Sequence, residues 1–128
     1  MTPSLRALAL AALILGCPAL ASGINTQAVT VGTTSGACFS TTTTGQAGQL
    51  PTALLGITVI NQSTTATLTF SLNSGSLPTA ATNAAGSITL SAQGTVGSSI
   101  TILDNGVAGS YMACIASGAS TPGTIIFL

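Results

Sequence analysis

Charged side chains are almost absent from this chain of 128 residues, which carries one positive and one negative group and no histidine. They are Arg6 and Asp104, whereas about 25% of residues are charged in ordinary globular domains. Acid–base catalysis and most metal sites need several such groups converging on one place, and nucleic-acid binding needs rows of cations. We therefore expect no enzyme, no catalytic residues, no metal, no cofactor, no small-molecule substrate and no nucleic-acid partner.

The composition also excludes a disordered chain, because 46% of the residues are hydrophobic and the formal net charge is zero. Its length suits one domain rather than two. Fifteen serines and 22 threonines replace the usual charged surface with hydroxyl groups. Since threonine favours strands over helices, this composition favours an all-β fold.

The first 21 residues, MTPSLRALALAALILGCPALA, have the layout of a secretory signal peptide. Arg6 precedes an apolar stretch, Ala7–Leu15, which forms an N-terminal apolar helix in such segments. Ala19–Ala21 then fits a small-residue cleavage site. We predict removal before Ser22, which leaves residues 22–128 as the folded domain of an exported, secreted or cell-surface protein.

Two other interpretations of this segment stay open. Leu5–Ala21 is about 17 residues long, the minimum for a spanning helix, so residues 1–21 could stay as an uncleaved apolar anchor. Ile14–Cys17 partly fits a lipoprotein signal, with lipid attachment at Cys17. A membrane is expected as a partner only if the segment is retained.

Beyond the leader, short runs rich in Val, Ile, Leu and Thr recur between clusters of Gly, Ser, Asn and Pro, a pattern of many short strands. The run from Thr65 to Leu72 alternates strictly, with Phe70 on an apolar face and hydroxyls on the other, which predicts a half-buried antiparallel strand. We predict eight strands, over Ala28–Gly32, Ala37–Thr42, Leu55–Asn61, Thr65–Asn73, Ser87–Ala92, Ser99–Leu103, Ser110–Ala116 and Thr124–Leu128.

About eight short strands after the apolar helix predict a single antiparallel β-sandwich of the jelly-roll or immunoglobulin-like kind. The turn residues of Asp104–Gly106 suggest that Ile100–Leu103 and Ser110–Ala116 form a hairpin. Asp104 is interpreted as a turn residue, because a calcium site needs several carboxylates.

Once the leader is removed, the cysteines are the pair Cys38 and Cys114. An even number of cysteines in an exported chain predicts a disulfide. A redox pair is disfavoured, because these two lack the close spacing and cationic neighbours of reactive thiols. The sequon Asn61–Ser63 leaves open whether Asn61 carries a glycan.

Soluble β proteins protect their sheet edges with lysine, proline or inward charges, and this chain has no such charges. We therefore expect the edges to meet partners, either copies of the same chain or other coat subunits. One candidate edge segment is Gly23–Gly32. The other, which we predict as the assembly edge, is the last five residues: Thr124, Ile125, Ile126, Phe127 and Leu128.

The stretch Gly56–Gln62, together with Ser110–Phe127, resembles small β-sandwich accessory proteins of phage virions. The leader, the early cysteine and the Ser/Thr/Gly-rich body are also similar to exported fibre and pilus subunits. The resemblance implies a structural subunit of a fibre, a coat or a similar surface assembly, or a virion accessory or decoration protein located on the virion. Pilus subunits pair cysteines much closer together than Cys38 and Cys114, so the likeness is one of fold.

A binding module is the alternative from a different class. The threonines of several strands could form a flat hydroxyl array that binds ice or a polysaccharide, although threonine is also the ordinary outward residue of a sheet poor in charge. The array would consist of Thr65, Thr67, Thr69, Thr89 and Thr101.

Overall fold

The computed structural model describes residues 25–40, 46–82, 84–103 and 106–128, and within these ranges it contains strands and no helix. The expected N-terminal apolar helix, its cleavage site and Cys17 lie outside the described residues. The eight strands are β1 (Asn25–Val31), β2 (Gly36–Ala37), β3 (Ile57–Asn61), β4 (Leu68–Asn73), β5 (Ser87–Leu90), β6 (Ser99–Ile102), β7 (Tyr111–Ala116) and β8 (Thr121–Phe127). The predicted all-β fold with about eight short strands is confirmed.

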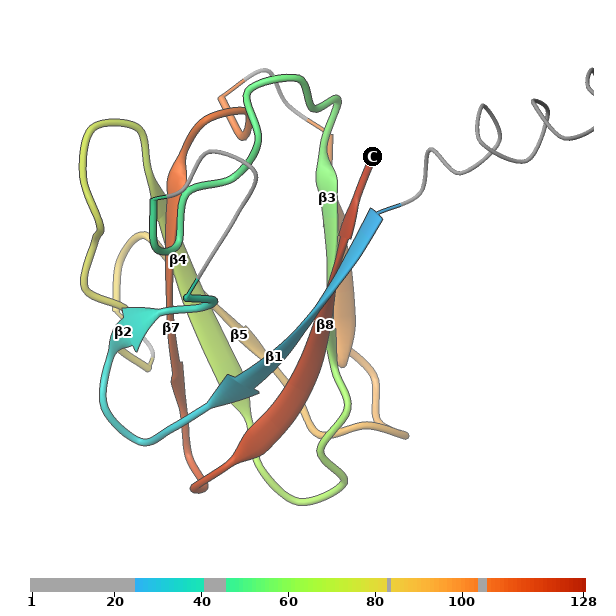
Figure 1. The fold of residues 1–128 in the computed structure, drawn as a ribbon. Coiled ribbons are helices and arrows are strands. Elements are labelled where there is room, and N and C mark those ends of the chain that lie inside the picture. Colours follow the sequence, from blue (N-terminus) through green and yellow to red (C-terminus); the bar gives the residue numbers. More distant parts are fainter. Residues whose placement is uncertain (1–24, 41–45, 83, 104–105) are drawn as a thin grey trace, which may run out of the picture.

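The strands form two antiparallel sheets of four, in the orders β1-β8-β3-β6 and β2-β7-β4-β5, which pack face to face as a sandwich (Figure 1). We call them the first and second sheet. The first strand pairs with the eighth, the second with the seventh, the third with the sixth and the fourth with the fifth. A long hairpin rolled into two sheets has this pairing, so the sandwich is a jelly roll rather than an immunoglobulin fold.

The core lies between the two sheets and is built from alternate residues of their strands. In β8 the side chain of Ile125 is fully buried, whereas its neighbours Thr124 and Ile126 are partly exposed. In β4 Leu68 and Phe70 have no exposed surface, as their alternation with hydroxyl residues predicts. The core residues with the largest fully buried apolar side chains are Phe70, Leu50, Ile57, Leu68, Met112 and Ile125.

The outer face of β4 differs from the expectation of a half-buried strand. Thr69 is only 1% exposed and Ser71 9%. Residues 74–82 leave the end of β4 and loop outside the second sheet (Figure 1). Ser71 Oγ donates a hydrogen bond to the carbonyl of Gly86 (3.0 Å), which ties the residue before β5 to the sheet.

The predicted hairpin between residues 100–103 and 110–116 is wrong. β6 pairs with β3 in the first sheet, whereas β7 pairs with β4 and β2 in the second. The chain between them crosses from one sheet to the other, and Val107 on this connection is buried at 3% exposure. A local turn signal cannot distinguish a hairpin from such a crossover. Asp104 and Asn105 lie outside the described residues.

Gly56, which precedes β3, has no room for a side chain. A Cβ atom there would lie 2.2 Å from the backbone oxygen of Ile102, whereas at Gly32 it would meet no atom within 4 Å. We expect Gly56→Ala to lower the free energy of unfolding by about 1–3 kcal/mol, because β3 and β6 must move apart. Gly32→Ala is the matched control and should leave stability within about 1 kcal/mol of the wild type. Urea unfolding curves measure both, and equal stabilities would contradict the close approach.

Candidate assembly edges

The predicted assembly edge, Thr124–Leu128, is not an edge, and this expectation is corrected. Residues 124–127 lie in β8, which pairs with β1 on one side and β3 on the other. Leu128 continues the ladder, because its N–H donates to the carbonyl of Gly56 (3.0 Å). The apolar character of this segment is that of an inner strand of its sheet.

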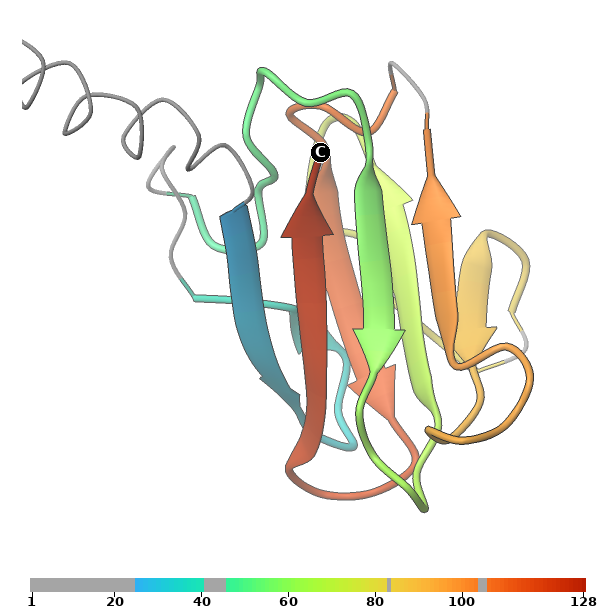
Figure 2. The same cartoon turned by 90° about the vertical axis from the view of Figure 1, so that its right-hand side faces the viewer.

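The other candidate segment, Gly23–Gly32, supplies an end strand. Its residues 25–31 form β1, and among the described residues β1 has β8 as its one sheet neighbour. Figure 2 shows β1 at one end of the first sheet and β6 at the other. The two segments singled out from the sequence therefore pair with each other within one chain, and the outer side of β1 is left as the edge.

The hydrogen bonds of β8 reveal which backbone groups of β1 face outward. Gln62 N–H donates to the carbonyl of Pro122 (3.0 Å), and Leu128 N–H donates to that of Gly56, so even-numbered residues of β8 point toward β3. The backbone N–H and C=O groups of successive residues in a strand point alternately to its two neighbours, so those of the odd-numbered residues of β8 point toward β1. The register between the two strands pairs the odd-numbered residues of β1 with these odd-numbered residues of β8. The N–H and C=O groups of the even-numbered residues, Thr26, Ala28 and Thr30, therefore point away from the sheet.

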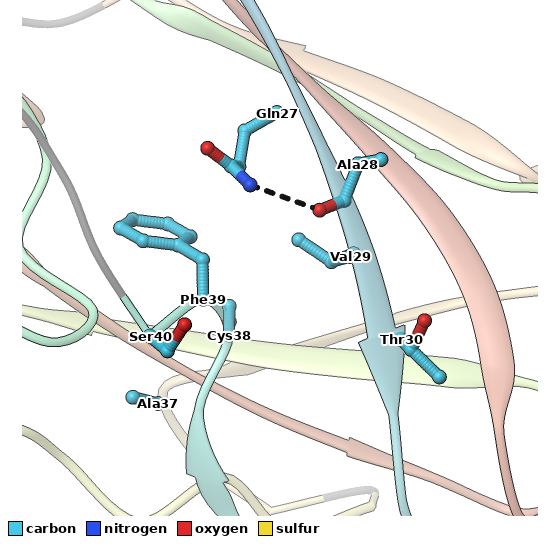
Figure 3. A pocket seen from close by; sticks show the side chains of 8 residues that line it. All are labelled: Gln27, Ala28, Val29, Thr30, Ala37, Cys38, Phe39 and Ser40. Atoms are coloured by element: carbon cyan, nitrogen blue, oxygen red, sulfur yellow. Dashed lines mark hydrogen bonds between the residues drawn. The ribbon is translucent and has the colours of Figure 1, made fainter.

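One side chain partly covers this edge. The side-chain amide Nε2 of Gln27 donates a hydrogen bond to the carbonyl of Ala28 (3.0 Å) in an exposed position (Figure 3). No lysine, proline or carboxylate lies in β1, so the usual protections of an edge strand are missing from it. Seven residues long, β1 is also longer than the other end strands, since β6 and β5 have four residues each and β2 has two.

A groove runs beside β1 at the side of the sandwich where the two sheets part. Its volume is about 290 Å³. One wall is β1 and the other is the segment that follows β2, with the Phe39 ring lying across from the β1 side chains (Figure 3). The lining residues are Gln27, Ala28, Val29, Thr30, Ala37, Cys38, Phe39 and Ser40. The groove therefore follows the open edge of β1.

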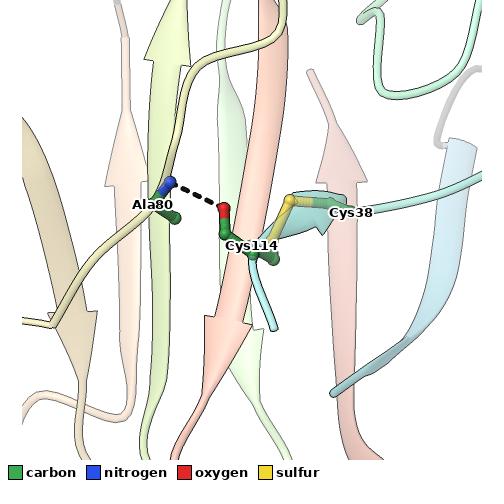
Figure 4. The surroundings of a disulfide bond; sticks show 4 residues. Cys38, Ala80 and Cys114 are labelled. Atoms are coloured by element: carbon green, nitrogen blue, oxygen red, sulfur yellow. Dashed lines mark hydrogen bonds between the residues drawn. A yellow bond between two sulfur atoms is a disulfide. The ribbon is translucent and has the colours of Figure 1, made fainter. Parts of the chain in front are cut away.

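A disulfide fixes the far wall of the groove. Cys38 and Cys114 are bonded, with Cα atoms 4.9 Å apart, so the predicted pairing is confirmed (Figure 4). Cys114 lies in β7, and Cys38 follows the two-residue strand β2. Both are buried, at 3% and 4% exposure. The bond holds the segment from Cys38 to Ser40 against the second sheet, while its other side faces β1.

Asn61 is a structural residue that the sequence pattern suggested only as a glycosylation site. Its side chain is fully buried, and Nδ2 donates to the carbonyls of Ala66 (2.8 Å) and Ser91 (2.9 Å). Its Oδ1 accepts from the N–H of Ser63 at 3.0 Å. Because Nδ2 is the atom to which a glycan is attached, the folded domain has no space for one. Asn61 instead links the end of β3 in the first sheet to residues that flank strands of the second.

The threonines of the expected hydroxyl array do not share one flat face. Thr69 is buried, and its Oγ1 hydrogen-bonds Thr89 Oγ1 (2.8 Å) on the second sheet. Thr101 lies in β6 of the first sheet, where its Oγ1 is 2.8 Å from that of Thr58. Thr65 and Thr67 precede β4 and lie outside any strand. The open outer face of the first sheet instead mixes other threonines with aliphatic residues.

No cluster of three or more His, Cys, Asp or Glu residues occurs within the described ranges. No helix in those ranges is long and apolar enough to cross a membrane. Every buried side-chain nitrogen and oxygen that the structure describes has a hydrogen-bond partner. The buried polar side chains of the described residues thus take part in hydrogen bonds within the sandwich.

Comparison with known proteins yields no relative. No family model, no curated protein and no solved structure matches the chain.

Proposed function

We propose that the protein is a non-catalytic structural subunit of an extracellular or surface assembly, such as a fibre or a coat, held together by β-strand pairing. The observation that carries this proposal is the edge of β1, which is seven residues long and contains neither charge nor proline. Exposed backbone donors and acceptors of this kind bind further strands unless they are protected. The partners are copies of this chain or other coat subunits.

Two further features support an exported subunit. A buried disulfide persists in oxidising compartments, which agrees with a secreted or surface location. The nearly uncharged chain also lacks the repulsion that keeps monomers apart in solution.

Jelly rolls occur in viral coat proteins and in sugar-binding lectins, so the fold alone does not choose between these functions. A phage virion accessory or decoration protein is the variant of the proposal in which the assembly is a virion. A polysaccharide- or ice-binding module is the second candidate function. It is favoured by the outer face of the first sheet, where Thr26, Thr30 and Thr101 are exposed.

The proposal predicts that the natively produced protein is found in assemblies much larger than one chain. Electron microscopy of material from the producing cell or particle should show filaments, coats or virions. Analytical ultracentrifugation of the exported protein should show association that increases with concentration. A protein that stays monomeric at high concentration, with no partner in native material, would contradict the proposal and leave the binding module as the better explanation.

A further inference from the structure

We propose that two copies of this chain pair through their β1 strands, antiparallel and about a two-fold axis at Ala28, so that the two first sheets merge into one. This contact deepens the proposed function and rests on it, because it names the edge and the partner through which assembly begins. In this register Thr26 of one copy lies opposite Thr30 of the other.

The backbone of β1 is complementary to itself in this arrangement. Thr26, Ala28 and Thr30 all direct their N–H and C=O groups away from β8, as the register with β8 requires. When Ala28 lies opposite Ala28 of the second copy, each of these three residues lies opposite a residue whose N–H and C=O groups also point out of the sheet. Opposed residues of this kind exchange two hydrogen bonds in an antiparallel ladder. A symmetric contact needs this property, because one surface has to serve both partners.

The side chains that meet across this contact are compatible. Thr26, Ala28 and Thr30 are exposed on the outer face of the first sheet. Threonine would lie opposite threonine and alanine opposite alanine, with no charge on either strand. Cross-strand threonine pairs stabilise a sheet, and the alanines that meet at the axis are too small to clash.

The groove beside β1 provides space on the inner face. In a second β1 strand added at this edge, the residues between Thr26, Ala28 and Thr30 direct their side chains to the inner face of the first sheet. Gln27 of the second copy would therefore lie beside the groove between β1 and the segment from Cys38 to Ser40, whereas Val29 stays buried in the core of its own copy at 6% exposure. Strand addition at a sheet edge commonly combines such backbone pairing with pockets for alternate side chains.

The edge of β1 fits a second copy better than do the other end strands of the molecule. β6 and β5 have four residues each and β2 has two, so each offers a shorter ladder than the seven residues of β1. The Gln27 amide that covers the Ala28 carbonyl is exposed to water, so the N–H of an arriving strand can replace it.

Ala28→Pro tests the contact. The substitution removes an N–H that does not bond to β8, so the sandwich should keep its fold, as edge strands tolerate proline at such positions. We expect the dissociation constant of the pair to rise about tenfold to a hundredfold, because two symmetric hydrogen bonds are lost. Ser99→Pro is the matched control, since Ser99 begins β6 and its N–H also points out of the sheet. Sedimentation equilibrium of the full exported chain measures both, and thermal unfolding checks the folds.

Charged variants keep the test decisive if the proline variant does not fold. Ala28 is exposed, so Ala28→Lys and Ala28→Glu should both fold. Each should fail to pair with itself, because like charges would meet at the axis, whereas an equimolar mixture should form a heterodimer. Pairing of β1 with β6 would give no such rescue.

The outcomes separate this contact from the proposed function. Loss of pairing in Ala28→Pro but not in Ser99→Pro, together with the mixed-charge heterodimer, supports the β1 contact. Native assemblies that persist with an unchanged dissociation constant in Ala28→Pro overturn the β1 contact and leave the structural function standing. A wild type that pairs through β1 but is found in no larger native assembly overturns the proposed function instead. A wild type that never associates overturns both.

Discussion

Replacing both Cys38 and Cys114 by alanine should lower the free energy of unfolding by about 4 kcal/mol. The disulfide closes most of the chain into one loop, since the two residues are 76 positions apart, and a cross-link of that span strongly restricts the unfolded chain. For a domain of this size such a loss corresponds to a melting temperature roughly 15–20 °C lower. Denaturant unfolding of the purified protein measures the change.

Reduction of the wild type is the control for this prediction, and it should reproduce the instability of the double variant. If the double variant were as stable as the wild type, the sandwich would be held by its core alone.

The loss should also have a local signature near the groove. β2 has only two residues, which pair with Cys114 and Ala113 of β7, so few backbone bonds hold this part of the chain to the second sheet. We expect amide hydrogen exchange at Cys38 and at residues beside it to accelerate more than exchange in β4. The segment opposite β1 would then loosen before the rest of the sandwich opens.

Asn61→Ala should be the second most damaging of these changes, lowering the free energy of unfolding by about 3 kcal/mol. The substitution leaves the carbonyls of Ala66 and Ser91 and the N–H of Ser63 without their side-chain partner in a buried site. Unmet hydrogen-bonding groups in an apolar interior are costly, because water cannot replace the lost partner. Urea unfolding measures the effect.

Two comparisons isolate the cause of this loss. Asn61→Asp keeps the size of the side chain and an oxygen for Ser63, but lacks both donor hydrogens, so it should also destabilise the domain strongly. Gln62→Ala changes the neighbouring exposed amide, which accepts one bond from Thr124 Oγ1 (2.9 Å), and should cost at most about 1 kcal/mol. Equal effects at positions 61 and 62 would show that the buried network does not hold the two sheets together.

Much of the fold follows from local patterns in the sequence. The alternation of apolar and hydroxyl residues around Leu68 and Phe70 predicts a strand and its buried face, because side chains of a strand point alternately to its two sides. The disulfide between Cys38 and Cys114 was also predictable, because only two cysteines follow the apolar N-terminal segment. The strand count followed from the spacing of turn residues.

Which strands lie at the edges of the sheets could not be predicted from local patterns. The apolar run from Thr124 to Leu128 has the composition of an exposed edge that binds a partner and equally that of an inner strand. Its own chain supplies β1 and β3 as its two neighbours. The same long-range pairing placed β6 and β7 in different sheets, despite a turn signal that favours a hairpin.

The sequence by itself determined that the chain folds into short strands and which faces of most strands are apolar. These properties depend on residues close together in the chain and on composition. Only the tertiary structure decided that β1 is an end strand with one sheet neighbour among the described residues, that a groove follows it and that Asn61 is buried. Those features depend on pairing between the two ends of the chain and on packing between the sheets, which no local pattern encodes.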